Sequence, residues 1–232
     1  MKLCIAVVMM ILGCISGSTY AQSRSADSVA GEGILNETLP VAAPFLIEGM
    51  QWTYRRVDLW QNAEIERFSQ TLVSAEPSYW VVRWQILSSK TKDRAGSITG
   101  ETLFTDTHGF DDARMVGRHE SLRFPLTVGK SWDFAYKFSG KPSSETKITQ
   151  TAKVKGWETV TVPAGRFRAI RVEHEGRYAT TDSGNSWGGR IQEVFLYSPV
   201  VRRIVAHEYK DTTGSGAAWD QWRDELMIGS YK

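Results

Sequence analysis

Three of the four histidines stand directly before a glutamate, and this is the first pattern in the chain with possible chemistry. The dipeptides are His119-Glu120, His174-Glu175 and His207-Glu208. Imidazole and carboxylate groups are the usual protein ligands of zinc and related ions. Neighbouring residues on a strand point to opposite faces, so such a dipeptide cannot turn both side chains to one ion. A site would need His174 and His207 to meet from separate strands, with "RIQEVFLY" between them. The sequence therefore predicts no metal ligands and no cofactor.

Paired carboxylates are the next candidates for chemistry. Asp220 and Asp224 share one face of an expected strand. Four residues of strand place them about 13 Å apart, beyond the roughly 5 to 9.5 Å used in glycoside hydrolysis. Neither an H-E-x-x-H helix nor a dinucleotide-binding glycine pattern occurs. We therefore predict no catalytic residue and a protein that is not an enzyme.

Aromatic side chains recur with period two in two segments. One row holds Trp80 and Trp84, and the other holds Trp132, Phe134 and Tyr136. Such rows either fill a core or line a concave surface that receives an apolar ligand such as an acyl chain. Trp187 stands apart in the glycine-rich stretch "DSGNSWGGR", which predicts an exposed loop contact. The candidate ligand-binding residues are Trp80, Trp84, Trp132, Phe134, Tyr136 and Trp187.

The elements that would position these residues are strands. From Gly49 onward, ten or eleven segments alternate apolar and polar residues, and Pro, Gly, Ser and Asn clusters separate them. The candidate strands cover residues 50–54, 64–73, 78–87, 97–106, 131–138, 146–156, 157–162, 166–178, 190–197, 201–210 and 219–229. Tight connections favour antiparallel neighbours. We predict an all-β fold with a single antiparallel up-and-down sheet, strongly curled into a half-barrel or barrel; a β-sandwich is the alternative.

Two connections are specific enough to interpret. In "VTVPAGRFRAIRV", Pro163 and Ala164 suit the centre of a turn, and Gly165 accepts the positive φ that starts the return strand. This stretch is therefore predicted as a structural corner. The segment Thr107–Leu126 lacks clear alternation, which predicts a long loop or short helix that covers one open end.

The N-terminus has the pattern of an export signal. Lys2 precedes a short apolar run, and cleavage after Ala21 gives a signal peptide over residues 1–21. Cys4 and Cys14 both lie within it, so the mature chain would contain no disulfide. We expect a flexible segment over 22–48 and a β domain over 49–232. A periplasmic or secreted location follows. The alternative is a lipoprotein anchored to the outer membrane through Cys14 of "ILGC", the one case in which membrane contact is expected.

Charge gives no sign of an electrostatic partner. The formal net charge is +2, and it becomes +1 when residues 1–21 are removed with their single charged residue, Lys2. Basic and acidic residues are mixed along the chain. This pattern predicts that nucleic acid is not a partner.

A family resemblance involves the region Trp157–Tyr209. The strings "WETVTVPAGRFRAIRV", "YSPVVRRIV" and "HEY" resemble a diffuse group of uncharacterised bacterial periplasmic proteins with a Val-Pro-Ala-Gly-x-Phe hairpin. That group looks like relatives of the open half-barrels of the LolA/LolB type, which carry lipoproteins or lipids across the periplasm. The resemblance implies a carrier of a lipid or another apolar small molecule, and it transfers no functional residue. The alternative function is a structural or assembly accessory that binds a protein partner at the cell envelope.

Overall fold

The described residues form one antiparallel sheet of thirteen strands. The computed structural model describes residues 36–90, 95–104, 109–111 and 115–230. The strands are β1 (Gln51–Asp58), β2 (Ala63–Ala75), β3 (Tyr79–Ser89), β4 (Ile98–Phe104), β5 (Gly109–Asp111), β6 (Met115–Gly117), β7 (His119–Glu120), β8 (Ser131–Lys141), β9 (Ser144–Val162), β10 (Gly165–Asp182), β11 (Asn185–Ser198), β12 (Arg203–Thr213) and β13 (Ala218–Ser230). Their order in the sheet is β6-β8-β9-β10-β11-β12-β13-β1-β2-β3-β4-β5-β7.

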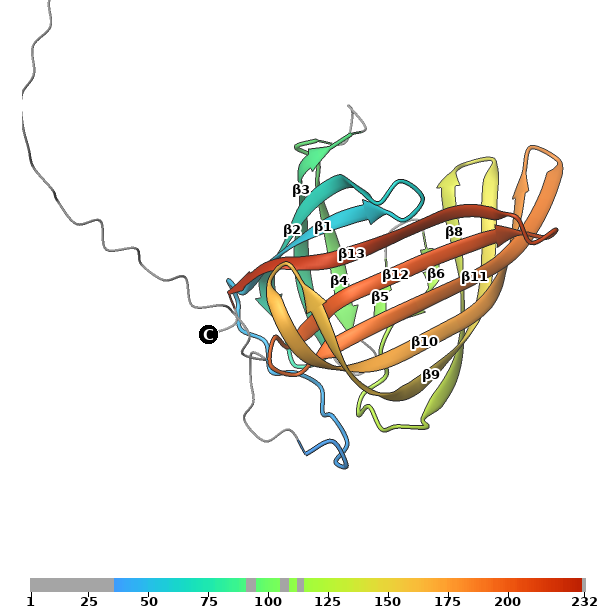
Figure 1. The fold of residues 1–232 in the computed structure, drawn as a ribbon. Helices are drawn as coiled ribbons and strands as arrows, with labels where there is room; N and C mark the ends of the chain where they lie inside the picture. The colour runs from blue at the N-terminus through green and yellow to red at the C-terminus, as the bar shows by residue number, and fades with distance from the viewer. Residues whose placement is uncertain (1–35, 91–94, 105–108, 112–114, 231–232) are drawn as a thin grey trace, which may run out of the picture.

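The sheet curls into an open half-barrel, which confirms the predicted fold class. Strands β8 to β13 form a meander, and β13 then pairs with β1, so the two ends of the domain lie side by side. Figure 1 shows the long strands β9 to β13 crossing one side of the molecule and β1 to β4 on the other. The tips of the β8–β9, β10–β11 and β12–β13 hairpins project at the same end.

The ten longer strands follow the alternating segments of the sequence, with one difference. Residues 146–156 and 157–162 were expected as two strands but form the single strand β9. The pairing of β9 with β10 shifts register between Arg171 and Val172, where Lys155 is skipped. This bulge interrupts the alternation without ending the strand. Val162 pairs with Gly165, and Gly165 has φ 132°, so the predicted corner at Pro163 is confirmed.

The expectation of a long loop or short helix over Thr107–Leu126 was wrong where the structure describes this segment. It contains the short strands β5, β6 and β7, and β5 and β7 extend the β4 edge of the sheet while β6 pairs with β8. Leu122 and Leu126 are fully buried. Strands of two or three residues are too short to show a period, which is why the sequence did not reveal them. Residues 105–108 and 112–114 lie outside the described part.

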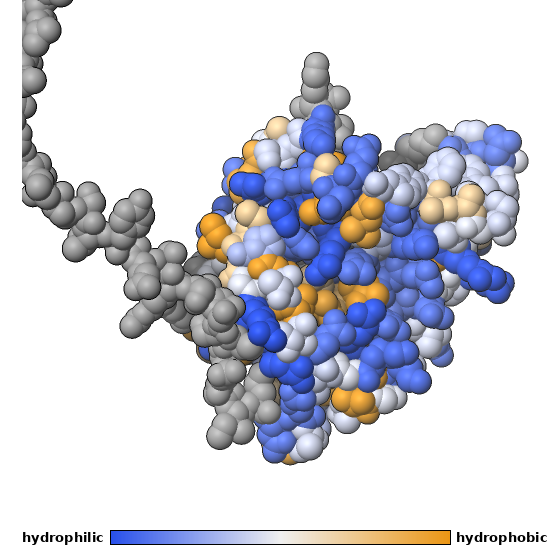
Figure 2. Space-filling model, viewed as in Figure 1, coloured by the Kyte–Doolittle hydropathy of each residue, from blue (hydrophilic) through white to orange (hydrophobic). Residues whose placement is uncertain are grey.

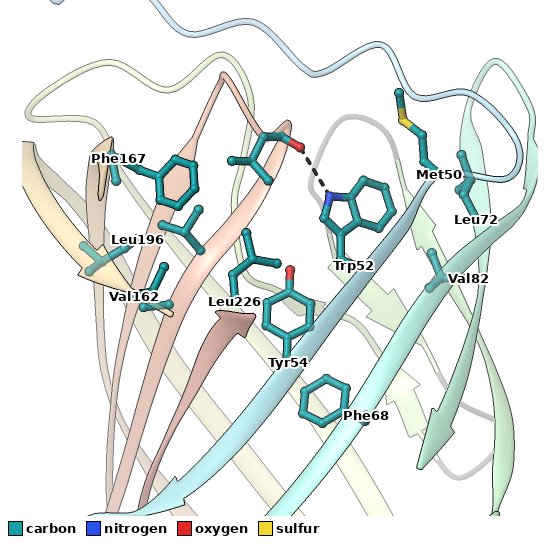
Figure 3. Close-up of a cluster of buried hydrophobic side chains, with 14 of the residues drawn as sticks. Met50, Trp52, Tyr54, Phe68, Leu72, Val82, Val162, Phe167, Leu196 and Leu226 are labelled. Atoms are coloured by element: carbon teal, nitrogen blue, oxygen red, sulfur yellow. Dashed lines mark hydrogen bonds between the residues drawn. The ribbon is translucent and has the colours of Figure 1, made fainter. Parts of the chain in front are cut away.

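Two clusters of buried apolar side chains hold the sheet together. The first joins β1, β2 and β3 to the starts of β10 and β12 and the end of β11, and it contains Trp52, Phe68 and Phe167. Figure 3 shows side chains from these two sides of the molecule facing each other, with the Trp52 indole donating a hydrogen bond. The acceptor is the Val201 carbonyl, at 3.3 Å.

The second cluster lies on the other face of the central strands. It contains Trp132, Phe134, Ile170, Phe195 and Tyr197 with Leu122, Phe124 and Leu126. Ala169 belongs to the first cluster and its neighbour Ile170 to the second, and both are almost fully buried. Adjacent strand residues point to opposite faces, so β10 is covered on both sides here. We call the side of the second cluster the inner face.

Part of the segment before β1 packs on the sheet. Val41 exchanges backbone hydrogen bonds with Leu126 at 2.8 Å, and Leu46 is 3% exposed in the first cluster. The predicted signal peptide with Cys4 and Cys14, and residues 22–35, lie outside the described residues. Within the described residues, no helix has the length and apolarity needed to span a bilayer.

Candidate functional site

Four ionisable side chains from four strands converge on the inner face. They are His119 of β7, His174 of β10, Glu193 of β11 and His207 of β12. His174 pairs directly with Glu193 across β10 and β11, and His207 pairs with Phe195, two residues further along β11. The strand pleat therefore turns all three toward one side. We call His119, His174, Glu193 and His207 the histidine–glutamate cluster.

Glu193 is the centre of the cluster. Its Oε2 lies 3.0 Å from His119 Nε2 and accepts a hydrogen bond of 2.7 Å from Gln150 Nε2. Its Oε1 lies 3.1 Å from His207 Nε2. The carboxylate is 6% exposed. Both oxygens have partners, as a buried carboxylate requires.

Ser121 orients two of the imidazoles. Its carbonyl oxygen accepts from His174 Nε2 at 3.1 Å, and its hydroxyl lies 3.0 Å from His119 Nδ1. Because His174 donates from Nε2, its Nδ1 carries a lone pair. That atom lies 3.8 Å from Glu193 Oε2 and has no hydrogen-bond partner in the described part of the chain.

The electrostatics follow from this geometry. Burial opposes the ionisation of Glu193, but the charges and hydrogen bonds of His119 and His207 outweigh it and hold its pKa well below the usual range. Burial also lowers the pKa of His174 to about 3, and the nearby Glu193 carboxylate offsets this only in part. His174 is therefore neutral at pH 7, although it faces a carboxylate.

Aromatic rings enclose the cluster. The His207 ring stacks on Phe195 at 4.1 Å and meets Trp222 edge-on at 5.0 Å. His119 meets the edges of Phe134 and Tyr136, each at 5.5 Å. Burial, followed by the Glu193 charge, raises the pKa of Tyr136, so this phenol stays neutral. The His207 side chain is 20% exposed, whereas that of His174 is fully buried, so solvent approaches the cluster from the His207 side.

The His-Glu dipeptides behave as the strand pleat predicts. His174 is buried while Glu175 is exposed on the other face. Glu120 pairs with Arg123, and Glu208 pairs with Arg223. The carboxylate that meets the histidines comes instead from "RIQEVFLY", the strand between His174 and His207. The sequence indicated this condition for a metal site but did not point to Glu193, Gln150, Ser121 or the contribution of His119.

One sequence signal for Glu193 was available. On the buried face of β11, Glu193 stands between Ile191 and Phe195, which are both apolar and buried. A carboxylate in a buried row needs partners from neighbouring strands. The position of His119 in the cluster had no comparable signal in the sequence, because it depends on the two-residue strand β7.

The aromatic candidates lie in two separate places. Trp80 is buried in the first cluster, and Trp84 packs against that cluster and stacks on Phe68 at 4.9 Å. Trp132 and Phe134 are buried in the second cluster, with Tyr136 half-buried beside them. The two predicted rows therefore belong to different clusters of the core.

Trp187 does not lie in a loop, so that expectation was wrong. It is a residue of β11, and it pairs with Thr180 of β10. Its side chain is 51% exposed. Gly184 lies in the turn between β10 and β11, whereas Gly188 and Gly189 are strand residues. Gly189 leaves room for the ring of Tyr178, its cross-strand partner. On the space-filling surface of Figure 2, apolar side chains form small patches among hydrophilic ones.

The chain is similar to two solved structures. One is a protein from Bacteroides fragilis named as exported and as having a YmcC-like fold, with 13% identity, a TM-score of 0.51, and coverage of 83% of this chain and 100% of that one. The other is a protein from Parabacteroides distasonis named as a lipoprotein, with 12% identity, a TM-score of 0.54 and the same coverage. No protein-family description matches the sequence, and no curated protein matches it. The similarity shows a shared fold.

Proposed function

We propose that this protein is a non-catalytic binding module of the cell envelope that takes up an apolar ligand, such as a lipid or acyl chain. The observation that carries the proposal is a set of partly exposed aromatic side chains on the inner face. They are Tyr136, Tyr178, Trp187, Tyr209 and Trp222, and we call them the aromatic rim.

Strand register supports a common face for the rim. Tyr136 and Tyr178 both pair with Ile148 of β9, one from each side. Tyr209 pairs with Glu193 on one side and with Trp222 on the other. Paired residues on neighbouring strands project to the same face, so these rings share a side with the histidine–glutamate cluster.

Exposure changes along the strands in the direction a ligand site requires. On β8, Trp132 and Phe134 are buried, whereas Tyr136 nearer the hairpin tip is half-buried. On β11, Phe195 is buried and Trp187 at the tip is exposed. Aromatic surface at partly open positions suits an apolar ligand, and the buried end provides rigid support.

Two further considerations support an envelope role. The structurally similar proteins are named as an exported protein and a lipoprotein. The resemblance to LolA/LolB-type half-barrels, with the expected signal peptide, suggests a periplasmic carrier. Release after cleavage remains our first expectation, and anchoring through Cys14 the alternative.

The test is competition between palmitate and a fluorescent fatty-acid probe. We expect saturable binding, and Trp187→Ala should weaken it about tenfold, which corresponds to about 1.4 kcal/mol. Trp157→Ala is the matched control, because Trp157 pairs with Ile170 of β10 and Trp187 with Thr180, ten residues along that strand. That separation is about 33 Å. Absence of saturable binding, or equal weakening by both variants, would contradict the proposal.

A second candidate function is an assembly accessory that binds a protein partner. Exposed indoles favour it: Trp60, Trp187 and Trp219 are 56%, 51% and 70% exposed, and each lies near a hairpin turn. Exposed aromatic side chains are enriched at protein interfaces. A protein that binds no palmitate but binds an envelope protein through Trp219 would support this candidate.

A further inference from the structure

The histidine–glutamate cluster brings together ligand atoms of the type and spacing that a transition metal requires. One nitrogen each of His119 and His174 and one oxygen of Glu193 lie within 4.8 Å of one another. His119 Nε2 lies 3.0 Å and His174 Nδ1 3.8 Å from Glu193 Oε2. Ligand atoms bound at ~2.0–2.1 Å to one tetrahedral zinc ion lie roughly 3.4 Å apart. Only small side-chain movements separate the cluster from that geometry.

The second nitrogen of each imidazole is already held. Ser121 contacts both rings through its carbonyl and hydroxyl oxygens, and it is itself 6% exposed. Metal-binding histidines usually donate their other N–H to an oxygen in this manner, which fixes the tautomer and the ring orientation. For His174, the contact leaves the Nδ1 lone pair directed toward Glu193.

Beside Glu193, two buried acceptor atoms have no donor among the described residues. They are His174 Nδ1 and Gln150 Oε1, and both belong to residues that touch Glu193. His174 is 1% and Gln150 3% exposed. A lone pair that faces a carboxylate with no hydrogen between them is unfavourable in a buried site. A bound cation would remove this conflict, whereas a purely structural network gives no reason for it.

We propose that His119, His174 and Glu193 bind one divalent transition-metal ion of the zinc type, with His207 as the fourth ligand. His207 Nε2 lies 3.1 Å from Glu193 Oε1, and to bind the ion it must release its proton to solvent and turn from the carboxylate to the metal. Imidazole and carboxylate donors suit Zn²⁺ and its neighbours in the first transition series, and they suit Mg²⁺ less well. The partly exposed side of His207 gives an ion access to the site. This site adjoins the aromatic rim at Tyr136 and Trp222, but it does not require an apolar ligand.

The experiment is calorimetric titration of the chelator-treated full-length mature protein with Zn²⁺ and Co²⁺, with Mg²⁺ as a comparison. We expect one Zn²⁺ or Co²⁺ per chain, a visible Co²⁺ spectrum typical of four ligands, and weak or no binding of Mg²⁺. Glu193→Gln should weaken Zn²⁺ binding at least about a hundredfold. Glu175→Gln is the matched control, because Glu175 is exposed on the opposite face and should bind as the wild type does.

Ser121→Ala keeps the test decisive if Glu193→Gln fails to fold, as judged by near-ultraviolet circular dichroism. It removes only the hydroxyl contact to His119 and should weaken Zn²⁺ binding about 10-fold or more. Nuclear magnetic resonance of ¹⁵N-labelled histidine should show a shift of His174 Nδ1 on addition of Zn²⁺. The proposal is overturned if the wild type shows no stoichiometric binding. It is also overturned if Glu193→Gln or Ser121→Ala binds as tightly as Glu175→Gln, or if the Nδ1 resonance stays in place.

Discussion

The two faces of β10 and β11 pack against different kinds of side chain. The first cluster, around Trp52 and Phe68, consists of apolar side chains, and the buried Arg203 beside the Trp52 ring donates its N–H groups to Gln70. The inner face has a comparable apolar base but also buries His119, His174 and Glu193. Buried charge is costly, and an apolar filling of similar volume is often at least as stable. The comparison teaches that the first cluster serves stability, whereas the inner face keeps polar groups that stability alone does not need.

The largest effect is expected in the first cluster. Trp52→Ala removes a side chain with no exposed surface and should cost about 3–5 kcal/mol of unfolding free energy, because it leaves a large cavity. Trp222→Ala, at the half-buried aromatic rim, should cost only about 1–2 kcal/mol. Urea unfolding of both variants measures the difference. Equal losses would show that the two faces do not differ in their role.

Acid should destabilise the inner face selectively. His174 has a pKa of about 3 in the folded protein and an ordinary value of 6.5 when unfolded, so the unfolded chain binds more protons between these values. Stability is therefore lost as pH falls below 6.5, by up to about 1.4 kcal/mol per pH unit. The low pKa of Glu193 adds a further loss below its ordinary value of 4.5.

The measurement for this prediction is unfolding free energy from pH 7 to pH 5 in the presence of a chelator. His174→Gln should reduce the slope, since it removes the titrating group that faces Glu193, His119 and His207. An unchanged slope in this variant would show that His174 is not held neutral by burial.

Gly189→Ala tests the packing beneath the aromatic rim. An added Cβ would lie 1.8 Å from the Thr212 carbonyl oxygen and 2.8 Å from the Tyr178 hydroxyl. Backbone must shift, and we expect a loss of about 1–3 kcal/mol with weaker binding of the fatty-acid probe. Gly214→Ala is the control, because the nearest atom to its Cβ would be 3.4 Å away. Similar thermal denaturation of the two variants would argue against a tightly packed strand at Gly189.

The smallest effect is expected at the exposed indoles. Trp219→Ala and Trp60→Ala should change unfolding free energy by no more than about 0.5 kcal/mol, because both side chains are more than half exposed. Thermal melts of these two variants measure the change. A loss above 2 kcal/mol would mean that these rings support the core.

Much of the sheet was predictable because long strands with one buried face have a clear period. Trp132, Phe134 and Tyr136 show this alternation, and β8 follows it. The position of Trp187 was mispredicted because glycines usually mark loops, whereas Gly189 here accommodates a cross-strand tyrosine. The separation of Trp80 from Trp132 depends on how the sheet curls, which alternation within one strand does not specify.

The candidate site was predictable only in part. Register places His174 beside Glu193, and the sequence already indicated that one strand runs between the strands of His174 and His207. It could not place His119, because the crossing of β6 and β7 to opposite edges of the sheet is a property of the whole fold. The contacts of Ser121 with His119 and His174 could not be predicted for the same reason.

Native mass spectrometry of the protein purified from its own host tests most directly whether the inner face binds an apolar ligand. We predict a population carrying the mass of a lipid or another acyl-bearing molecule, released on collisional activation and reduced in Trp187→Ala. A spectrum that contains only the mass of the bare chain, in both proteins, would contradict it.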